Sequence, residues 1–283
     1  MTANGYANPE ALVSTQWLGD HLDDPALRII EVDEDTTAYE RGHIPDAVAW
    51  NWTTDLHTPV VRDYLDRDAL AALLAAAGVT GSTRLVLYGG NHNWFAAYAY
   101  WILRLRGFDA VALLNGGRTK WELENRPQTL DTPRVEPTAV TLTGPERPEI
   151  RAMRDEVLAE EGGATRLVDV RSPEEYSGEK LAPDHLPQEQ AYVPGHIPGA
   201  ANIPWARAAN DDGTFKSATE LAALYAENGI TADHPVIAYC RIGERSSHTW
   251  FALTELLGYP NVRNYDGSWT EYGSMVAVPV EKG

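Results

Sequence analysis

The amino-acid sequence predicts an α/β protein made of two tandem domains, each a parallel sheet flanked by helices. The first observation is an internal repeat. The tetrapeptide GHIP at residues 42–45 recurs at residues 195–198, and residues 85–121 match residues 236–272 without a gap, 151 positions later. The second observation is that short apolar runs alternate with segments of helical periodicity in each half. A duplicated α/β unit accounts for both observations.

The length of 283 residues fits two domains of ordinary size. The segment that joins the halves contains five prolines, which suits an extended linker: Pro127, Pro133, Pro137, Pro145 and Pro148. We therefore expect an amino-terminal domain at 1–126, a linker at 127–148 and a carboxyl-terminal domain at 149–283.

Strands are expected where apolar runs are short and bounded by turn residues. The expected strands are residues 27–32, 85–88 and 111–114 in the first half, and 166–170, 236–239 and 262–265 in the second. Apolar runs of this kind are typical of parallel strands that are buried on both faces.

Helix signals lie between these strands. Asp66 can cap a helix that ends near Gly78, and Ser217 with Glu220 forms a capping box before a second helix. A third helical pattern covers residues 247–257. The second half also carries an insertion, residues 177–193, which is either a functional loop or a tolerated surface insertion.

The composition excludes several classes of partner. The net charge is −18, with 41 acidic against 23 basic residues, which disfavours nucleic acid and anionic membranes. No apolar run approaches the roughly 20 residues that span a bilayer. The first residues lack the pattern of a secretory signal, so we expect a cytoplasmic protein.

Cys240 is the single cysteine, so the chain has neither an internal disulfide nor a resolving thiol. It follows an apolar strand that ends at Tyr239 and opens a loop, 240–246, that leads into a helix, where loop amides and the helix N-terminus favour an anion. Arg241 and Arg245 add positive charge, so we expect the pKa of the Cys240 thiol to be depressed. The alternative is a merely buried thiol.

The first half lacks these features. Gly89 occupies the position that matches Cys240, and no arginine stands near it within residues 88–94, so we expect that half to be catalytically silent. His43 and His196 precede Ile-Pro in matched turns and are interpreted as turn anchors, whereas His248 is assigned no role.

Asp169 and Arg171 lie two positions apart at the end of an expected strand. We interpret Arg171 as part of a structural ion pair and Asp169 as an outer support of the loop. No metal-ligand spacing, GxGxxG or P-loop pattern occurs, so no metal or cofactor is expected.

The sequence resembles the tandem rhodanese family of thiosulfate sulfurtransferases over nearly the whole chain. The resemblance rests on GHIPGA at 195–200 and on the six-residue loop that begins Cys240-Arg241 and continues through Gly243 to Arg245. Residues 239–250 and 264–272 are especially similar to the actinobacterial enzymes. The resemblance implies two tandem rhodanese-like domains, of which only the second is active.

The resemblance implies a thiosulfate:cyanide sulfurtransferase that moves sulfane sulfur from thiosulfate to cyanide or a thiol acceptor through a Cys240 persulfide. Its partners are a small-molecule sulfur donor and a thiophilic acceptor, and we expect a monomer or weak homo-oligomer. Arg241 and Arg245 are expected to hold the donor's oxygens, with Gly243 and Glu244 beside them in the substrate site. No general base is expected.

Three positions depart from the eukaryotic enzymes that the sequence resembles. Ile242 stands where they have Lys, Arg245 where they have Thr, and Glu175 where they have a substrate-contacting Arg. Lys180, in the inserted segment, could supply the missing charge or be a solvated surface residue.

The alternatives are three. A 3-mercaptopyruvate sulfurtransferase is disfavoured because such relatives have Gly at the position of Arg241. A cysteine phosphatase needs Cys-x5-Arg, where this chain has Ser246. A non-catalytic interaction module would not need Cys240 with two arginines.

Overall fold

The computed structural model describes residues 4–160, 163–183 and 190–283. They form two compact units. The amino-terminal unit comprises Pro9–Arg147 and Asn210–Phe215. The carboxyl-terminal unit comprises the described residues of Met1–Asn8, Pro148–Ala209 and Lys216–Gly283. Two short segments depart from a single boundary near residue 148. The described residues of Met1–Asn8 group with the carboxyl-terminal unit, and Asn210–Phe215 groups with the amino-terminal unit.

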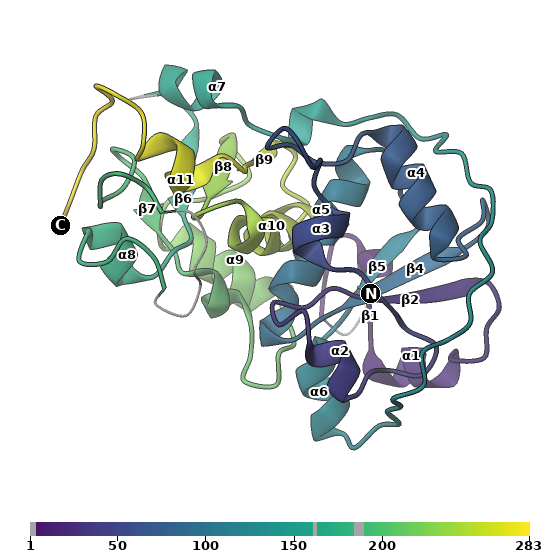
Figure 1. Ribbon diagram of the computed structural model, residues 1–283. Helices are drawn as coiled ribbons and strands as arrows, with labels where there is room; N and C mark the ends of the chain where they lie inside the picture. Colours follow the sequence, from purple (N-terminus) through teal and green to yellow (C-terminus); the bar gives the residue numbers. More distant parts are fainter. Residues whose placement is uncertain (1–3, 161–162, 184–189) are drawn as a thin grey trace. The chain divides into compact units, whose positions relative to one another are not determined.

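A five-stranded parallel sheet forms the centre of the amino-terminal unit, with strand order β1-β5-β4-β2-β3 (Figure 1). The strands in chain order are β1 (Leu12–Val13), β2 (Leu27–Glu31), β3 (Val48–Ala49), β4 (Arg84–Tyr88) and β5 (Val111–Leu114). Its helices are η1 (Pro9–Ala11), α1 (Thr15–Asp20), α2 (Ala38–Arg41), α3 (Trp52–Asp55), α4 (Arg67–Ala76), η2 (Asn91–Asn93), α5 (Trp94–Leu105) and α6 (Gly117–Leu123).

The carboxyl-terminal unit repeats this plan with a four-stranded parallel sheet in the order β7-β6-β8-β9 (Figure 1). The strands are β6 (Arg166–Asp169), β7 (Ala201–Asn202), β8 (Val236–Tyr239) and β9 (Val262–Tyr265). Its helices are η3 (Pro148–Ile150), α7 (Arg154–Ala159), α8 (Pro173–Ser177), η4 (Trp205–Ala208), α9 (Ala218–Ala226), α10 (Glu244–Phe251), the π-helical turn η5 (Ala252–Leu256) and α11 (Ser268–Tyr272).

The parallel α/β prediction is confirmed, and the six predicted strands are present with ends that differ by at most one residue. The predicted caps are also present: the Asp66 carboxylate accepts from the Ala69 amide, and Ser217 forms its capping box with Glu220. The third helix differs, because it begins at Glu244 rather than 247 and continues as the π-helical turn.

Each sheet buries a matching core on one face. In the amino-terminal unit, alternate residues of β2 and β4 pack with Leu18 of α1 and Trp121 of α6. In the carboxyl-terminal unit, Ile237 and Tyr239 of β8 pack with Val157 of α7 and Trp269 of α11. Figure 1 shows α10 beside β8 and β9, which it contacts directly.

The two histidines of the repeated turn have the same surroundings. The His43 ring stacks on Tyr39 with centroids 3.6 Å apart, and the His196 ring stacks on Tyr176 at 3.6 Å. In both turns His Nδ1 lies 2.9 Å from the carbonyl oxygen of the stacked tyrosine. These matched contacts confirm the interpretation of both histidines as turn anchors.

In the part of the chain that the structure describes, no helix combines the length and the apolar character that crossing a bilayer requires.

Candidate active site

Cys240 lies directly after β8, and the loop from Cys240 to Gly243 connects that strand to α10. Gly243 has φ +102°, and a Cβ atom there would lie 2.9 Å from Cα of Asp266. A larger residue would therefore be both strained and in contact with backbone. Glycine at this position lets the chain turn sharply, so that α10 begins four residues after the cysteine.

The Cys240 side chain is fully buried, with 0% of its surface exposed. Its Sγ accepts a hydrogen bond from the Gly243 amide at 3.1 Å, and the thiol donates to Glu244 Oε2 at 3.3 Å. The sulfur thus lies between a backbone donor of the loop and a carboxylate of the following helix.

The backbone of the loop is held by α11. The Cys240 amide donates to Ser268 Oγ at 3.0 Å, and the carbonyl oxygens of Cys240 and Arg241 accept from the amides of Trp269 and Thr270 at 3.1 and 3.0 Å. Because these bonds fix both sides of the cysteine, the sulfur has a defined position with respect to the sheet.

The predicted depression of the thiol pKa is wrong for this structure. Burial raises the pKa of Cys240 above its usual value, the Glu244 carboxylate raises it further, and Arg245 and hydrogen bonds from Ser246 only partly oppose this. The sequence shows the two nearby arginines but does not show that the thiol is buried beside a carboxylate.

Arg245 forms a buried ion pair with Glu175. Its Nη1 and Nη2 donate to the two carboxylate oxygens of Glu175 at 2.7 and 3.0 Å, and both side chains are buried. Burial alone would raise the pKa of Glu175, but Arg245 holds it below its usual value. Two of the departures from the eukaryotic pattern are thus partners in one ion pair, which engages both terminal nitrogens of Arg245.

Arg241 is also buried, and it belongs to the same electrostatic cluster. Burial lowers the pKa of Arg241, and Arg245 adds to this, while Glu244 and the Cys240 sulfur act in the opposite direction. An arginine remains protonated at neutral pH despite such effects. The structure therefore brings Cys240, Arg241, Gly243, Glu244 and Arg245 together around one sulfur atom.

Asp169 and Arg171 form the buried ion pair expected for Arg171. Arg171 Nε lies 3.0 and 3.1 Å from the two carboxylate oxygens of Asp169, and Nη2 also donates to the Gly195 carbonyl at 2.7 Å. The guanidinium carbon of Arg171 lies 4.7 Å from the centroid of the Trp269 ring. Asp169 therefore supports α11, which in turn holds the cysteine loop.

Lys180 is exposed, and its amide donates to the Glu174 carbonyl at 2.9 Å. Its charge acts on the Glu174 carboxylate, where it contributes to lowering the pKa. The structure does not bring Lys180 into the buried cluster around Cys240. Of the inserted segment 177–193, residues 184–189 lie outside the described part of the chain.

The amino-terminal counterpart of the site is closed. A Cβ atom on Gly89 would lie 2.2 Å from the Val32 carbonyl oxygen. The Asp33 carboxylate accepts from the Gly90 amide at 2.6 Å and lies 3.4 Å from Arg118 Nε. The Asp33 carboxylate thus already accepts the hydrogen bond that the Gly90 amide would otherwise donate to an anionic ligand.

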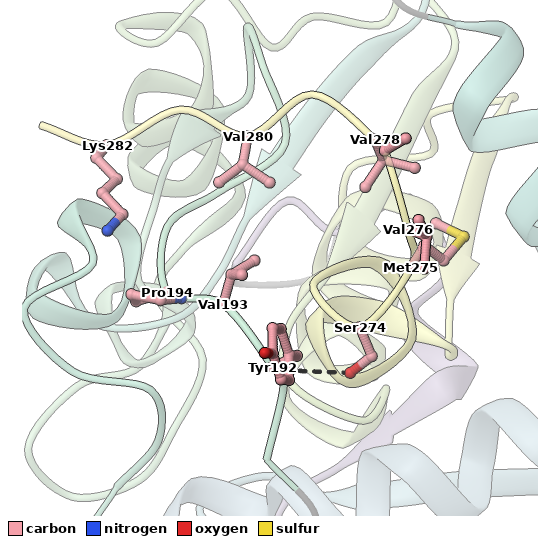
Figure 2. A pocket seen from close by; sticks show the side chains of 10 residues that line it. Tyr192, Val193, Pro194, Ser274, Met275, Val276, Val278, Val280 and Lys282 are labelled. Carbon is pink, nitrogen blue, oxygen red and sulfur yellow. Dashed lines mark hydrogen bonds between the residues drawn. The ribbon is translucent and has the colours of Figure 1, made fainter.

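The end of the inserted segment lines a groove of 880 Å³ on the carboxyl-terminal unit (Figure 2). Tyr192, Val193 and Pro194 line it from the end of the insertion, and residues 274–278 with Val280 and Lys282 line it from the carboxyl-terminal segment. The Val193 carbonyl accepts from Trp269 Nε1 at 3.0 Å, so the groove adjoins the helix that holds the cysteine loop. Cys240 does not line it. Sequence reasoning pointed to the insertion but not to this groove.

Within residues 4–160, 163–183 and 190–283, no three His, Cys, Asp or Glu side chains are grouped so as to hold a metal ion.

Comparison with known proteins identifies the repeated unit. Residues 14–124 and 153–275 both match the Rhodanese-like domain family. A protein of Mycolicibacterium smegmatis named "Putative thiosulfate sulfurtransferase" is 56% identical over 277 residues, which cover 98% of this chain and 99% of the relative. The sulfur carrier protein TtuD of Thermus thermophilus is 53% identical over 284 residues, covering 99% of both chains.

Two solved structures are similar in fold to this chain. The wild-type structure of EanB is 27% identical and has a TM-score of 0.81, covering 97% of this chain and 69% of its own. An EanB variant with a cysteine persulfide, in a tetrahedral intermediate state with ergothioneine, is 27% identical with a TM-score of 0.84, covering 98% of this chain and 72% of its own.

Proposed function

The chain belongs to the rhodanese family and is a sulfurtransferase, and we propose that it transfers the sulfane sulfur of thiosulfate through a persulfide on Cys240. The observation that carries the proposal is the position of the single cysteine of the chain, at the strand–loop–helix junction of the carboxyl-terminal unit. The relatives' names support the reaction class, and the EanB persulfide shows that a cysteine of a similar fold can hold the extra sulfur.

The proposed reaction has two half-reactions. The Cys240 thiolate attacks the outer sulfur of thiosulfate, the S–S bond of the donor breaks, and sulfite leaves with the electron pair. In the second half-reaction, cyanide or a thiolate attacks the outer sulfur of the persulfide, and the Cys240 thiolate leaves. The Gly243 amide, 3.1 Å from Sγ, is placed to stabilise negative charge on sulfur in both half-reactions.

Donor recognition is proposed to depend on Arg241. A guanidinium offers a planar set of donors that suits the oxygens of a sulfonate-like group. We assign the donor to Arg241 because it directly follows Cys240 and its charge interacts with the sulfur, whereas Arg245 forms an ion pair with Glu175. Arg245 then acts through the loop, by tying the first turn of α10 to α8.

The test is an intact-mass measurement after incubation with thiosulfate, together with an assay of released sulfite. We expect a gain of one sulfur, about 32 Da, that cyanide removes and that Cys240→Ser abolishes. Arg241→Ala should take up the same sulfur, but only at a donor concentration about tenfold or more higher. If neither thiosulfate nor 3-mercaptopyruvate adds sulfur, the proposed function is wrong; sulfur from mercaptopyruvate alone would reassign the donor.

A further inference from the structure

Glu244 is a buried carboxylate placed directly against the thiol. It is the first residue of α10, it is only 1% exposed, and its Oε2 lies 3.3 Å from the Cys240 sulfur. Its other oxygen, Oε1, is buried and has no hydrogen-bond partner among the described residues. Leaving a buried charged acceptor without a partner is unfavourable, and at Glu244 this occurs on a carboxylate that also contacts the thiol.

The charges around this pair come from four elements. The loop contributes Arg241, and α8 contributes Glu175, which forms the ion pair with Arg245 of α10. Helix α10 also carries the buried His248, one helical turn after Glu244. Asp266, between β9 and α11, packs against Gly243 and is paired with Arg151, whose Nε donates to it at 2.8 Å. Glu175 and Asp266 are each paired with an arginine, whereas Glu244 contacts the thiol.

We propose that Glu244 accepts the proton of the Cys240 thiol when sulfur is loaded and returns it when sulfur is delivered. This proposal rests on the proposed function. In the first half-reaction the S–H proton passes to Oε2, the thiolate attacks the outer sulfur, and sulfite leaves with the electron pair of the broken S–S bond. In the second, the acceptor bonds to the outer sulfur, the persulfide bond breaks, and the departing Cys240 thiolate regains the proton from Glu244.

A shared proton has a consequence for the pH dependence. Over the range in which the pair holds one proton, the fraction with the proton on Glu244 does not change with pH, so the loading rate is flat. Without the carboxylate, the thiol must lose its proton to solvent, and the rate rises tenfold per pH unit up to the thiol pKa. Thiosulfate itself remains a dianion throughout, so the profile reports on the enzyme.

The experiment measures sulfite release in a single turnover at subsaturating thiosulfate from about pH 5.5 to 9. The wild-type rate should be flat to about pH 8, whereas Glu244→Gln should be roughly a hundredfold slower at pH 6 and should recover tenfold with each unit of rising pH. Glu244→Asp keeps the carboxylate and should keep the flat profile at a lower rate. Glu255→Gln, at another buried carboxylate of this unit, should match the wild type.

Two results would overturn the proposal: a wild-type rate that rises with pH as steeply as that of Glu244→Gln, or a Glu244→Gln variant at least as fast as the wild type at pH 6. Either would mean that Glu244 only repels the thiolate. The rate at which neutral iodoacetamide alkylates Cys240 should show the same difference in pH dependence between the wild type and Glu244→Gln. This reaction needs no sulfur donor. If the wild type is alkylated at a rate that does not change with pH but takes up no sulfur, the proposed function is wrong and the proton role stands. If sulfur is taken up but the rates of the wild type and Glu244→Gln rise equally with pH, the proton role is wrong and the proposed function stands.

Discussion

The ion pair between Arg245 and Glu175 ties the cysteine loop to the start of α8. Glu175 also accepts from the Ser172 amide at 3.1 Å, so its carboxylate serves both the cap of α8 and the guanidinium. Because both charges are buried, neither can be solvated if the other is removed. The pair therefore contributes to stability as a unit and fixes the direction in which α10 leaves the loop.

Glu175→Gln should lower the free energy of unfolding by about 3 kcal/mol, because it leaves the buried Arg245 without a charged partner. Urea denaturation at pH 7 measures the change. Glu174→Gln, at the exposed neighbouring residue, is the matched control and should have a much smaller effect. If the two substitutions lowered the free energy of unfolding equally, the buried pair would contribute no more to stability than the exposed carboxylate of Glu174.

The same pair makes the stability of the protein depend on pH in the acid range. Arg245 lowers the folded-state pKa of Glu175 below its usual value of 4.5, so the pair's contribution is present above that value and is lost as pH falls through the folded pKa. The stability difference between wild type and Glu175→Gln should therefore be full at pH 7 and shrink below about pH 4.5. A difference that grew in acid would contradict this assignment.

At the scale of elements, the turn from β8 into α10 depends on Gly243, whose φ of +102° and contact with the Asp266 backbone exclude a side chain. Gly243→Ala should destabilise the protein by more than the roughly 1–2 kcal/mol of a left-handed alanine, because the contact at 2.9 Å adds to the strain. It should also abolish the hydrogen bond from the residue 243 amide to Sγ and reduce sulfur uptake.

Gly229→Ala is the control for Gly243→Ala. Gly229 also has a positive φ, +74°, but a Cβ atom there would meet nothing within 4 Å. Thermal unfolding and sulfite release, measured on both variants, separate backbone strain from the contact in the loop. Equal destabilisation and equal activity would show that the close approach to Asp266 is unimportant.

The main elements could be predicted from sequence because buried parallel strands and capped helices leave local patterns. Strands β1, β3 and β7 were missed because each has only two residues, too few for an apolar run to be recognised. The contact between Glu175 and Arg245 was missed for a different reason. The two residues lie 70 positions apart, and nothing local to either indicates the other.

The protonation of Cys240 could not be predicted either. The sequence places Arg241, Glu244 and Arg245 near the thiol but does not give their orientation. The structure shows that Arg245 points to Glu175 while Glu244 faces the sulfur, so burial and Glu244 dominate the pKa. Neighbouring charges in a sequence therefore indicate a charged site without indicating which charge reaches the reactive atom.

At the scale of the whole molecule, the two units share a plan but differ in what occupies the end of the central strand. In the carboxyl-terminal unit this place holds Cys240. In the amino-terminal unit it holds Gly89, and the neighbouring Gly90 amide is already bonded to Asp33, which also pairs with Arg118. The difference goes beyond a missing thiol, because the backbone there has no room for a side chain.

Restoring the cysteine should therefore not restore a site. In Gly89→Cys, the new Cβ atom would start 2.2 Å from the Val32 carbonyl, so we expect a less stable protein that still gains only one sulfur, about 32 Da, from thiosulfate. Gly89→Cys combined with Cys240→Ser should gain none. Gly81→Ala, at an open position of the same unit, should leave both stability and uptake unchanged. Sulfur on the double variant would show that the fold alone, without Arg241, Arg245 and the loop that carries them, is sufficient to load a thiol.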